Sequence, residues 1–258
     1  MKPSILVVTA TLGNRNSLQR TIDSTKNIKN CLIKHIIVAP QNIIPKLKEK
    51  YPNIVYIAEP QNKRGIYAAL NHAFFTYGKG FQYFTFINDD DYWLPQFQIL
   101  IDQIRQNPEL DFVYGKTIYI NDENRCIGKQ TSANMFKRFI PLLHSSIILL
   151  TQQSTLIKSQ LFFKIGGFDE NYKLVADTKF WATLSLLDIK YKYVNKYCAA
   201  YTIQEGQLSS DISTQRNEHS RLLNELPQYP QWIIKQSQFI FRIINFPIYF
   251  NRIIKRLC

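Results

Sequence analysis

Three consecutive aspartates, Asp89, Asp90 and Asp91, stand directly after an aromatic and β-branched run in the segment FINDDDYW (residues 86–93). Like charges a few ångströms apart repel by about 4 kcal/mol at an effective dielectric of roughly 20. One aspartate can cap the helix expected from Pro95, since acidic side chains favour a first helical turn. Three exceed the need of one cap. Because Mg²⁺ and Mn²⁺ prefer oxygen ligands, the functional alternative is a divalent-cation site.

The segments around the aspartates alternate between strand-like and helix-like patterns through the first 120 residues. Strands are expected at 4–9, 35–39, 53–58 and 82–87, and helices at 16–27, 43–50, 65–77 and 95–105. This alternation predicts βαβ units in an α/β fold, with a Rossmann-like, mostly parallel sheet flanked by helices. Ligands of such sheets bind beyond the carboxyl ends of the strands. Since the aspartates follow Ile87, we expect them at that edge.

The second half of the chain is less regular. We expect a strand at 111–120, an irregular stretch to about residue 150, a strand or strand pair at 191–202, and helices at 159–165, 177–187 and 208–225. No internal repeat or low-complexity linker divides these segments. The pattern predicts an α/β domain over residues 1–228 and a distinct tail over residues 229–258.

The composition is that of a folded protein with anionic partners. Of the 258 residues, 45% are hydrophobic and 14% aromatic, which provides a sizeable core and excludes a disordered chain. The formal charge of +13 suggests phosphates, nucleic acid or an anionic membrane surface as partners. The four cysteines form no CxxC pair, which argues against a zinc knuckle and fits a reduced, intracellular setting. We expect neither a signal peptide nor a membrane-spanning helix.

The tail over residues 229–258 combines positive charge with apolar residues. It holds five basic residues, Lys255 and Arg256 among them, and no acidic one, and the pattern predicts an amphipathic helix. Pro247 is expected to kink this helix or to split it in two. A basic amphipathic helix of this kind can lie in the plane of an anionic membrane. The alternative is a terminal helix that packs on its own domain.

Four segments, in order along roughly residues 4–225, resemble family 2 glycosyltransferases, which have a GT-A fold. ILVVTATLGNRNSL resembles the family's nucleotide-binding first loop, and EPQNKRGIYAALNHAF is similar to its E-P-D-K-G-I-Y-D-A-M-N segment. FINDDDYW resembles the F-L-N-x-D-D segment, which contains the DxD motif, and KIGGFDENYKLVADTKFW resembles the G-G-F-D-E segment. A DxD motif alone is a weak signal, whereas four matches in the family's order are a strong one.

The resemblance implies transfer of a sugar from a nucleotide-diphosphate sugar, commonly UDP- or dTDP-linked, to a hydroxyl with inversion. It implies Mg²⁺ or Mn²⁺ bound by Asp90 and Asp91 against the two phosphates, with Asp89 at the metal, its waters or the ribose. A dication stabilises the charge that develops on the leaving nucleoside diphosphate. The donor-binding residues that the matches imply are Thr9, Thr11, Arg15, Gly65, Asn71, Asn88 and Asp89.

The family's catalytic base is an Asp that follows G-G-F-D-E and opens a helix, and it corresponds here to Asp177. In that role it takes the proton from the acceptor hydroxyl as this oxygen attacks the anomeric carbon. The alternative is that Asp177 is the N-cap of its helix. Both roles are compatible at the ligand edge of the sheet.

The chain also departs from the family pattern. The second expected strand is followed by Ala39 and Pro40 rather than by an acid, and Ala68 stands where relatives carry an Asp. Lys63 and Arg64 are candidates for pairing with phosphate. These departures leave the nucleotide base of the donor open. The sugar, the acceptor and the linkage stay open too, because they depend on the irregular residues 121–160.

The sequence therefore predicts an inverting, metal-dependent glycosyltransferase of bacterial surface polysaccharide or lipopolysaccharide synthesis. We expect it in the cytoplasm, peripheral on the inner face of the cell membrane, with a glycan or lipid-linked acceptor. A sugar-nucleotide nucleotidyltransferase is one alternative, disfavoured because TATLGNRN has one glycine where such enzymes need a Gly-rich loop. A non-catalytic anion- or nucleic-acid-binding protein is the other. Since no nucleic-acid-binding motif occurs, we expect no nucleic-acid partner.

Overall fold

The structure is a computed structural model that describes residues 2–63, 65–204, 206–207 and 211–257, with the backbone alone for residues 253–257. Three residues that the sequence analysis singled out, Arg64 and the side chains of Lys255 and Arg256, lie outside the described part.

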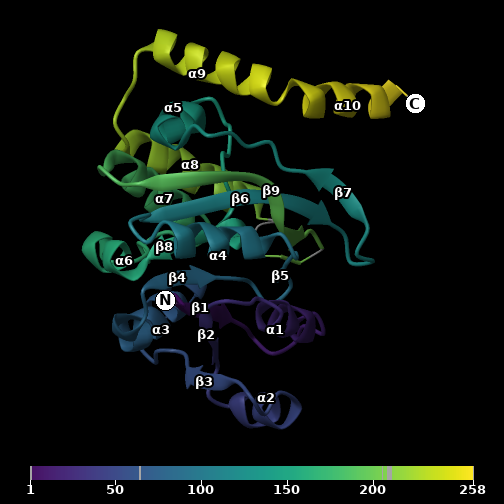
Figure 1. Cartoon of the computed structure of the whole chain (residues 1–258), viewed down its shortest axis with the longest axis vertical. Coiled ribbons are helices and arrows are strands. Elements are labelled where there is room, and N and C mark those ends of the chain that lie inside the picture. The colour runs from purple at the N-terminus through teal and green to yellow at the C-terminus, as the bar shows by residue number, and fades with distance from the viewer. Residues whose placement is uncertain (1, 64, 205, 208–210, 258) are drawn as a thin grey trace.

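A nine-stranded sheet forms the centre of the molecule, in the order β3-β2-β1-β4-β8-β6-β9-β5, with β7 beside β6 (Figure 1). Its N-terminal strands run parallel, as predicted: β1 (Ser4–Ala10), β2 (Leu32–Ala39), β3 (Val55–Ala58) and β4 (Tyr83–Phe86). In β1, Val8 lies beside Ile36 of β2 and Phe86 of β4. The carboxyl ends of these strands therefore reach one edge.

The other half of the sheet is mixed, which qualifies the expectation of a mostly parallel sheet. It contains β5 (Tyr92–Trp93), β6 (Phe112–Ile120), β7 (Cys126–Lys129), β8 (Thr155–Lys158) and β9 (Tyr191–Thr202). Strand β8 runs antiparallel to both β4 and β6, whereas β6 and β9 are parallel. The chain reaches β8 from β7 through short helical segments, the last of which is the turn η3 (Gln152–Ser154), and β8 then pairs antiparallel rather than as part of a βαβ unit. The α/β fold is confirmed.

Helices cover both faces of the sheet because side chains of a strand alternate between them. In β1, Leu6 and Val8 point to the face packed by α3, whereas Ile5 and Val7 point to the face packed by α4. The helices are α1 (Leu18–Lys26), α2 (Ile44–Lys50), α3 (Ile66–Tyr77), α4 (Phe97–Gln106), α5 (Phe139–His144), α6 (Ser159–Ile165), α7 (Ala176–Leu186) and α8 (Ile212–Glu225), with short turns η1 (Gly78–Gly80) and η2 (Phe136–Arg138).

The C-terminal segment forms two helices, α9 (Gln231–Ile244) and α10 (Phe246–Leu257), along one end of the molecule (Figure 1). They divide at Asn245, and Pro247 occupies the first turn of α10, where a missing N–H costs no helical bond. The predicted split is thus confirmed. Helix α9 packs against α5, and its Phe241 is fully buried in the core. Within the described residues, no helix is long and apolar enough to span a bilayer.

Candidate active site

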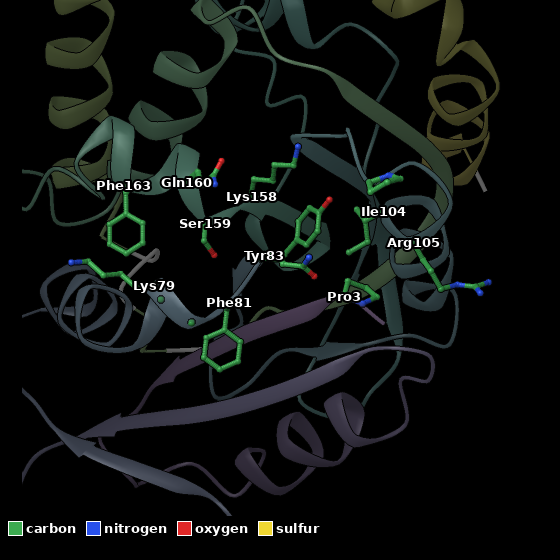
Figure 2. A pocket seen from close by; sticks show the side chains of 14 residues that line it. Pro3, Lys79, Phe81, Tyr83, Ile104, Arg105, Lys158, Ser159, Gln160 and Phe163 are labelled. Atoms are coloured by element: carbon green, nitrogen blue, oxygen red, sulfur yellow. The ribbon is translucent and has the colours of Figure 1, made fainter. Parts of the chain in front are cut away.

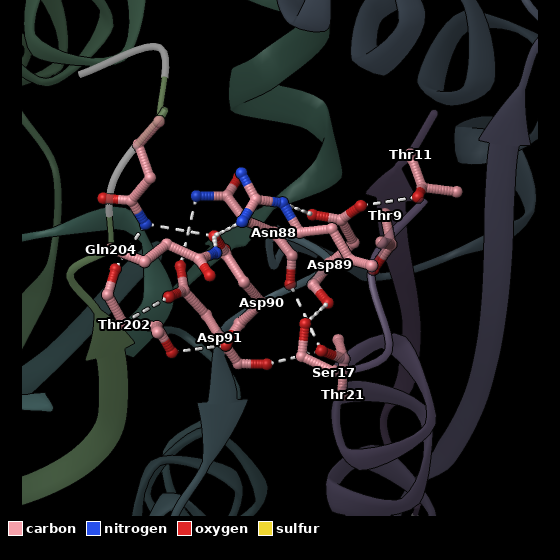
Figure 3. A network of polar contacts seen from close by, with 12 residues as sticks. Thr9, Thr11, Ser17, Thr21, Asn88, Asp89, Asp90, Asp91, Thr202 and Gln204 are labelled. Atoms are coloured by element: carbon pink, nitrogen blue, oxygen red, sulfur yellow. Dashed lines mark hydrogen bonds and ion pairs between the residues drawn. The ribbon is translucent and has the colours of Figure 1, made fainter. Parts of the chain in front are cut away.

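The three aspartates form a turn directly beyond β4, closed by a bond from the Asp91 N–H to the Asn88 carbonyl. Helix α1 and strand β9 hold their backbone in place (Figure 3). On one side, Ser17 and Thr21 donate to the carbonyls of Asp89 and Asp91. The Arg20 guanidinium, also of α1, donates to the Asp90 carbonyl at 3.0 Å. From the other side, the Thr202 hydroxyl of β9 donates to the same carbonyl at 2.5 Å. The carboxylates consequently point in fixed directions.

Asp91, which the resemblance implies as a metal ligand, points into the protein in this structure. Its side chain is fully buried and accepts bonds from Asn88 Nδ2, Gln153 Nε2 and the Thr202 N–H, at 2.6–3.1 Å. Burial, together with the charge of the neighbouring Asp90, raises the pKa of Asp91 well above its usual value. Both oxygens are committed to joining β4, β9 and η3. Asp91 therefore has a structural role, and Asn88 supports it by one of these bonds.

Asp89 and Asp90 converge on one guanidinium. Arg15 Nε lies 3.6 Å from Asp89 Oδ1, and Arg15 Nη1 lies 3.5 Å from Asp90 Oδ2. The second Asp89 oxygen accepts a bond from the Thr11 hydroxyl at 2.5 Å. Burial raises the pKa of Asp89, and the nearby Arg15 and the Thr11 bond oppose this effect. The positive charge that the aspartate run requires is thus supplied in this structure by Arg15.

Two glutamines that the sequence analysis did not assign to the site also bind Asp90. Gln204 Nε2 and Gln207 Nε2 donate to Asp90 Oδ2 at 2.8 and 3.0 Å, and Figure 3 shows the Gln204 amide reaching the carboxylate. Both follow β9, far from the aspartates in sequence. The available signal was a further resemblance: EGQLSS (residues 205–210) is similar to a G-G-x-S turn of the family, with Gln207 in place of the second glycine.

Thr9 lies in the core rather than at the predicted nucleotide site. It is fully buried, and its hydroxyl lies 2.8 Å from the Ile87 carbonyl and 2.9 Å from Nε2 of the buried His35. Thr11, two residues further, lies on the same side of the strand's end and does reach the aspartates. Its hydroxyl also accepts the Gly13 N–H, which stabilises the turn that Gly13 makes at φ +73°.

Asn71 of α3, which the family matches imply as a donor-binding residue, is bonded to the GGFDE loop in this structure. It is buried, its Oδ1 accepts the Phe168 N–H, and its Nδ2 donates to the Phe168 carbonyl and to Glu170. A Cβ at Gly167 would stand 2.5 Å from Asn71 Oδ1, so this approach requires glycine. The GGFDE loop is therefore fixed to α3. Gly65 precedes this helix at φ +106°, with open space around it.

Asp177 lies in the first turn of α7 and is half-buried. Its Oδ1 accepts bonds from the Tyr67 hydroxyl at 3.1 Å and the Thr178 N–H at 2.7 Å, and no described residue donates to Oδ2. Tyr67 belongs to the first turn of α3, which begins where the chain leaves the carboxyl end of β3. Asp177 is thus tied to the same sheet edge as the aspartate turn. Burial raises its pKa.

Glu218 of α8 holds the backbone that leads into Asp177, and no motif in the sequence pointed to this residue. Its carboxylate accepts the N–H groups of Lys173, Leu174 and Val175 at 2.7–3.2 Å. These three residues directly precede α7. A carboxylate that binds three successive amides holds a loop tightly, because charged acceptors make the stronger hydrogen bonds.

Two cavities lie near the sheet, at different ends of its parallel strands. A cavity of about 890 Å³ lies between α3 and the GGFDE loop, beside the ion pair of Lys63 with Glu170. Another, of about 710 Å³, is lined by Pro3, Tyr83 and Lys158 among others (Figure 2). Pro3 and Tyr83 stand at the amino ends of β1 and β4. Ligands of parallel sheets bind at the carboxyl ends, so this second cavity is not the candidate site.

A divalent cation fits the residues present at the aspartate turn. Asp89 and Asp90 already direct one oxygen each at a single positive group. In the described part of the chain, no three His, Cys, Asp or Glu side chains cluster as a complete metal site. Two carboxylates suffice for a Mg²⁺-type ion, which completes its shell with waters and substrate phosphates. Such an ion would take the position that Arg15 holds between the carboxylates.

Residues 6–168 match the family model described as Glycosyl transferase family 2. The chain belongs to glycosyltransferase family 2. The match covers the aspartate turn and ends at Phe168, before Asp177. No curated protein matches the sequence of this glycosyltransferase.

Solved glycosyltransferases share the fold at low sequence identity. Residues 1–349 of S. aureus TarS, in complex with UDP-GlcNAc, align with a TM-score of 0.64 and 15% identity, over 87% of this chain and 71% of that one. Mannosyltransferase PcManGT from Pyrobaculum calidifontis, in complex with GDP-Man and Mn²⁺, aligns with a TM-score of 0.60 and 12% identity, over 92% and 69%. The chain spans 37% of a longer TarS structure. The fold is GT-A, and the protein is a glycosyltransferase.

Proposed function

We propose that this glycosyltransferase moves a sugar, with inversion and with help from a divalent cation, from a nucleotide-diphosphate sugar to a hydroxyl of a glycan or lipid-linked acceptor. The observation that carries the proposal is the meeting of two parts of the chain at one sheet edge. Asp89 and Asp90 offer oxygens to a cation there, and Asp177 presents Oδ2 without a described hydrogen-bond donor.

The donor's diphosphate would bind beside Asp89 and Asp90. A Mg²⁺ or Mn²⁺ ion held by these carboxylates would supply positive charge to the leaving nucleoside diphosphate. Arg15 reaches the same carboxylates, and once released from them its guanidinium can pair with a phosphate. Thr11, at the end of β1, orients Asp89. Gly65 leaves space before α3. Lys63, two residues earlier, carries a positive charge that is paired with Glu170 in this structure.

Asp177 would serve as the base. Tyr67 and Thr178 hold its Oδ1, which aims Oδ2 and leaves it to accept the proton of the acceptor hydroxyl. The oxygen of the acceptor hydroxyl then forms the new bond to the anomeric carbon. The bond from this carbon to the diphosphate breaks on the opposite face, which inverts the configuration. Burial raises the pKa of Asp177 and so makes it a stronger base than an exposed Asp.

The nucleotide stays open between uridine, thymidine and guanosine diphosphates. The sequence resemblance favours UDP or dTDP, whereas the two structural relatives carry UDP-GlcNAc and GDP-Man. We infer a role in bacterial surface polysaccharide or lipopolysaccharide synthesis at the inner face of the cell membrane. The family match favours this function over nucleotidyl transfer or nucleic-acid binding.

The test is a release assay with a panel of UDP-, dTDP- and GDP-sugars. Purified protein is incubated with each donor in Mn²⁺, in Mg²⁺ or in EDTA, and the freed nucleoside diphosphate is quantified. We expect release from one class of donor, dependent on the cation and lost in Asp90→Asn and Asp177→Asn. Release that persists in EDTA or in both variants would contradict the proposed chemistry.

A further inference from the structure

Helices α9 and α10 expose a continuous apolar stripe, which we define as Trp232, Phe239, Ile243, Phe246 and Phe250. Each of these side chains is at least 50% exposed. Their spacings of seven, four, three and four residues place them on one helical face, and the stripe crosses the break at Asn245. The rings of Phe246 and Phe250 stack with centroids 5.7 Å apart. Large apolar patches of this kind mark interaction sites.

The opposite face of the two helices holds the stripe outward. Phe241 and Ser237 are fully buried, and Arg138, just before α5, donates to the Ser237 hydroxyl. Asn245 is buried at the helix break, where its Oδ1 accepts the Ser132 N–H. Arg252 of α10 donates to the Lys129 carbonyl of β7. The helices therefore cannot turn the stripe into the protein without losing these contacts.

Positive charge accompanies the stripe. Residues 226–258 contain five basic residues and no acidic one. Lys235 and Arg242 are exposed, and their helical positions lie along one flank of the stripe. Neither forms an ion pair with a described acidic side chain. An apolar stripe edged by unpaired cations complements a surface of acyl chains under anionic headgroups.

We propose that the stripe of α9 and α10 docks on the surface of an anionic lipid bilayer, with the helices parallel to the membrane. Helices of 14 and 12 residues are too short to cross a hydrocarbon core, which requires about 20 residues. Tryptophan and phenylalanine are well suited to the interface, and the basic flank reaches the headgroups. Figure 1 shows both helices along one end of the molecule, where they are accessible to a flat surface.

The stripe is the surface through which the protein would reach its proposed membrane location, and only that location rests on the proposed function. It does not depend on the active site. A protein that binds vesicles without transferring sugar would contradict the proposed chemistry and leave the docking surface standing. A protein that transfers sugar and ignores vesicles would do the reverse.

The test combines vesicle flotation with tryptophan emission. Trp93 and Trp181 are buried, so a blue shift on adding vesicles reports on Trp232. We expect the full chain to float with phosphatidylglycerol-containing vesicles, at least tenfold more than with pure phosphatidylcholine, and to show the blue shift. Flotation should fall at least tenfold in Phe239→Glu/Phe246→Glu and severalfold in Lys235→Gln/Arg242→Gln. In Trp232→Phe the blue shift should vanish while flotation remains.

The matched control is Leu32→Glu, because Leu32 is 60% exposed and belongs to β2, which lies far from α9 and α10 in Figure 1. It should float like the wild type, and circular dichroism should show that all variants are folded. Absence of flotation with anionic vesicles would overturn the proposal, as would equal flotation of the double phenylalanine variant. Sedimentation velocity that shows a dimer abolished by the same substitutions, without vesicle binding, would assign the stripe to a second copy of the chain instead.

Discussion

At the scale of single residues, the burial that makes Asp177 a stronger base also lowers the stability of the fold when the carboxylate is charged. Its pKa is raised in the fold because burial disfavours the charged carboxylate. A carboxyl with a higher pKa in the folded state binds more protons folded than unfolded over that interval. Stability therefore falls as pH rises from the unfolded pKa through the folded one, and the loss is complete above it.

Asp177→Asn should therefore separate activity from stability. We expect sugar transfer to fall by about 10²- to 10⁴-fold, the usual contribution of a general base. The melting temperature at pH 8 should stay equal or rise, because an amide carries no charge to desolvate. Nucleotide affinity should not change. Initial rates, thermal denaturation and nucleotide titration measure the three quantities, and a wild-type rate would remove Asp177 from the mechanism.

Arg15 gives a second prediction, because it holds the position proposed for the cation. Arg15→Met removes the guanidinium and leaves Asp89 and Asp90 to repel each other. We expect tighter Mn²⁺ binding without nucleotide, since the ion no longer displaces an internal cation, and weaker nucleotide binding once Mn²⁺ is saturating. Electron paramagnetic resonance of free Mn²⁺ measures the first effect. An unchanged Mn²⁺ affinity would show that Arg15 does not compete with the ion.

At the scale of elements, α8 positions the start of α7 through Glu218. Glu218→Gln keeps the shape of the side chain and replaces a charged acceptor of three amides by a neutral one. We expect kcat to fall about tenfold because the orientation of Asp177 is disturbed. The KM for the donor should not change because the donor site is unaffected. The control is Glu225→Gln on the same helix, whose partners are Lys179 and Arg221. Equal effects in both variants would indicate a general loss of stability.

Helix α3 fixes the GGFDE loop through Asn71. Asn71→Ala leaves the Phe168 N–H and carbonyl without this partner, at a cost of about 1–3 kcal/mol for each buried group. The melting temperature should drop by several degrees, whereas nucleotide affinity per folded molecule should stay close to that of the wild type. A selective loss of nucleotide binding in a fully stable variant would restore Asn71 to the donor site.

The local pattern of the sequence predicts the parallel half of the fold well, because successive strands there are connected by single helices and lie in one sheet. It does not predict β8 as an antiparallel insertion, since its partners β4 and β6 lie far away along the chain. The site shows the same division. Family motifs identify the aspartate turn. They do not identify Gln204, which binds Asp90 from beyond β9, or Glu218, which binds the backbone before Asp177 from α8. The inward direction of Asp91 could not be predicted either, because it depends on tertiary contacts with Gln153 and Thr202.

At the scale of the whole molecule, the tail packs on its domain through one face and carries the proposed docking stripe on the other. Phe241 packs on the domain, while the stripe on the other face remains exposed. A chain ending after Asn245 keeps α9 and the bond of Asn245 to Ser132 but lacks α10. We expect it to fold and bind nucleotide as the full chain does, with about tenfold weaker flotation on anionic vesicles. Undiminished flotation would confine the docking surface to α9.

The central claim is that Asp89 and Asp90 hold a dication against the donor's diphosphate, and calorimetric titration tests it most directly. UDP, dTDP and GDP are each titrated into wild-type protein and into Asp90→Asn, with Mn²⁺ and with EDTA. The account predicts that at least one of them binds the wild type with Mn²⁺ and loses at least tenfold in affinity both in EDTA and in the variant. Equal affinity in all these conditions would contradict it.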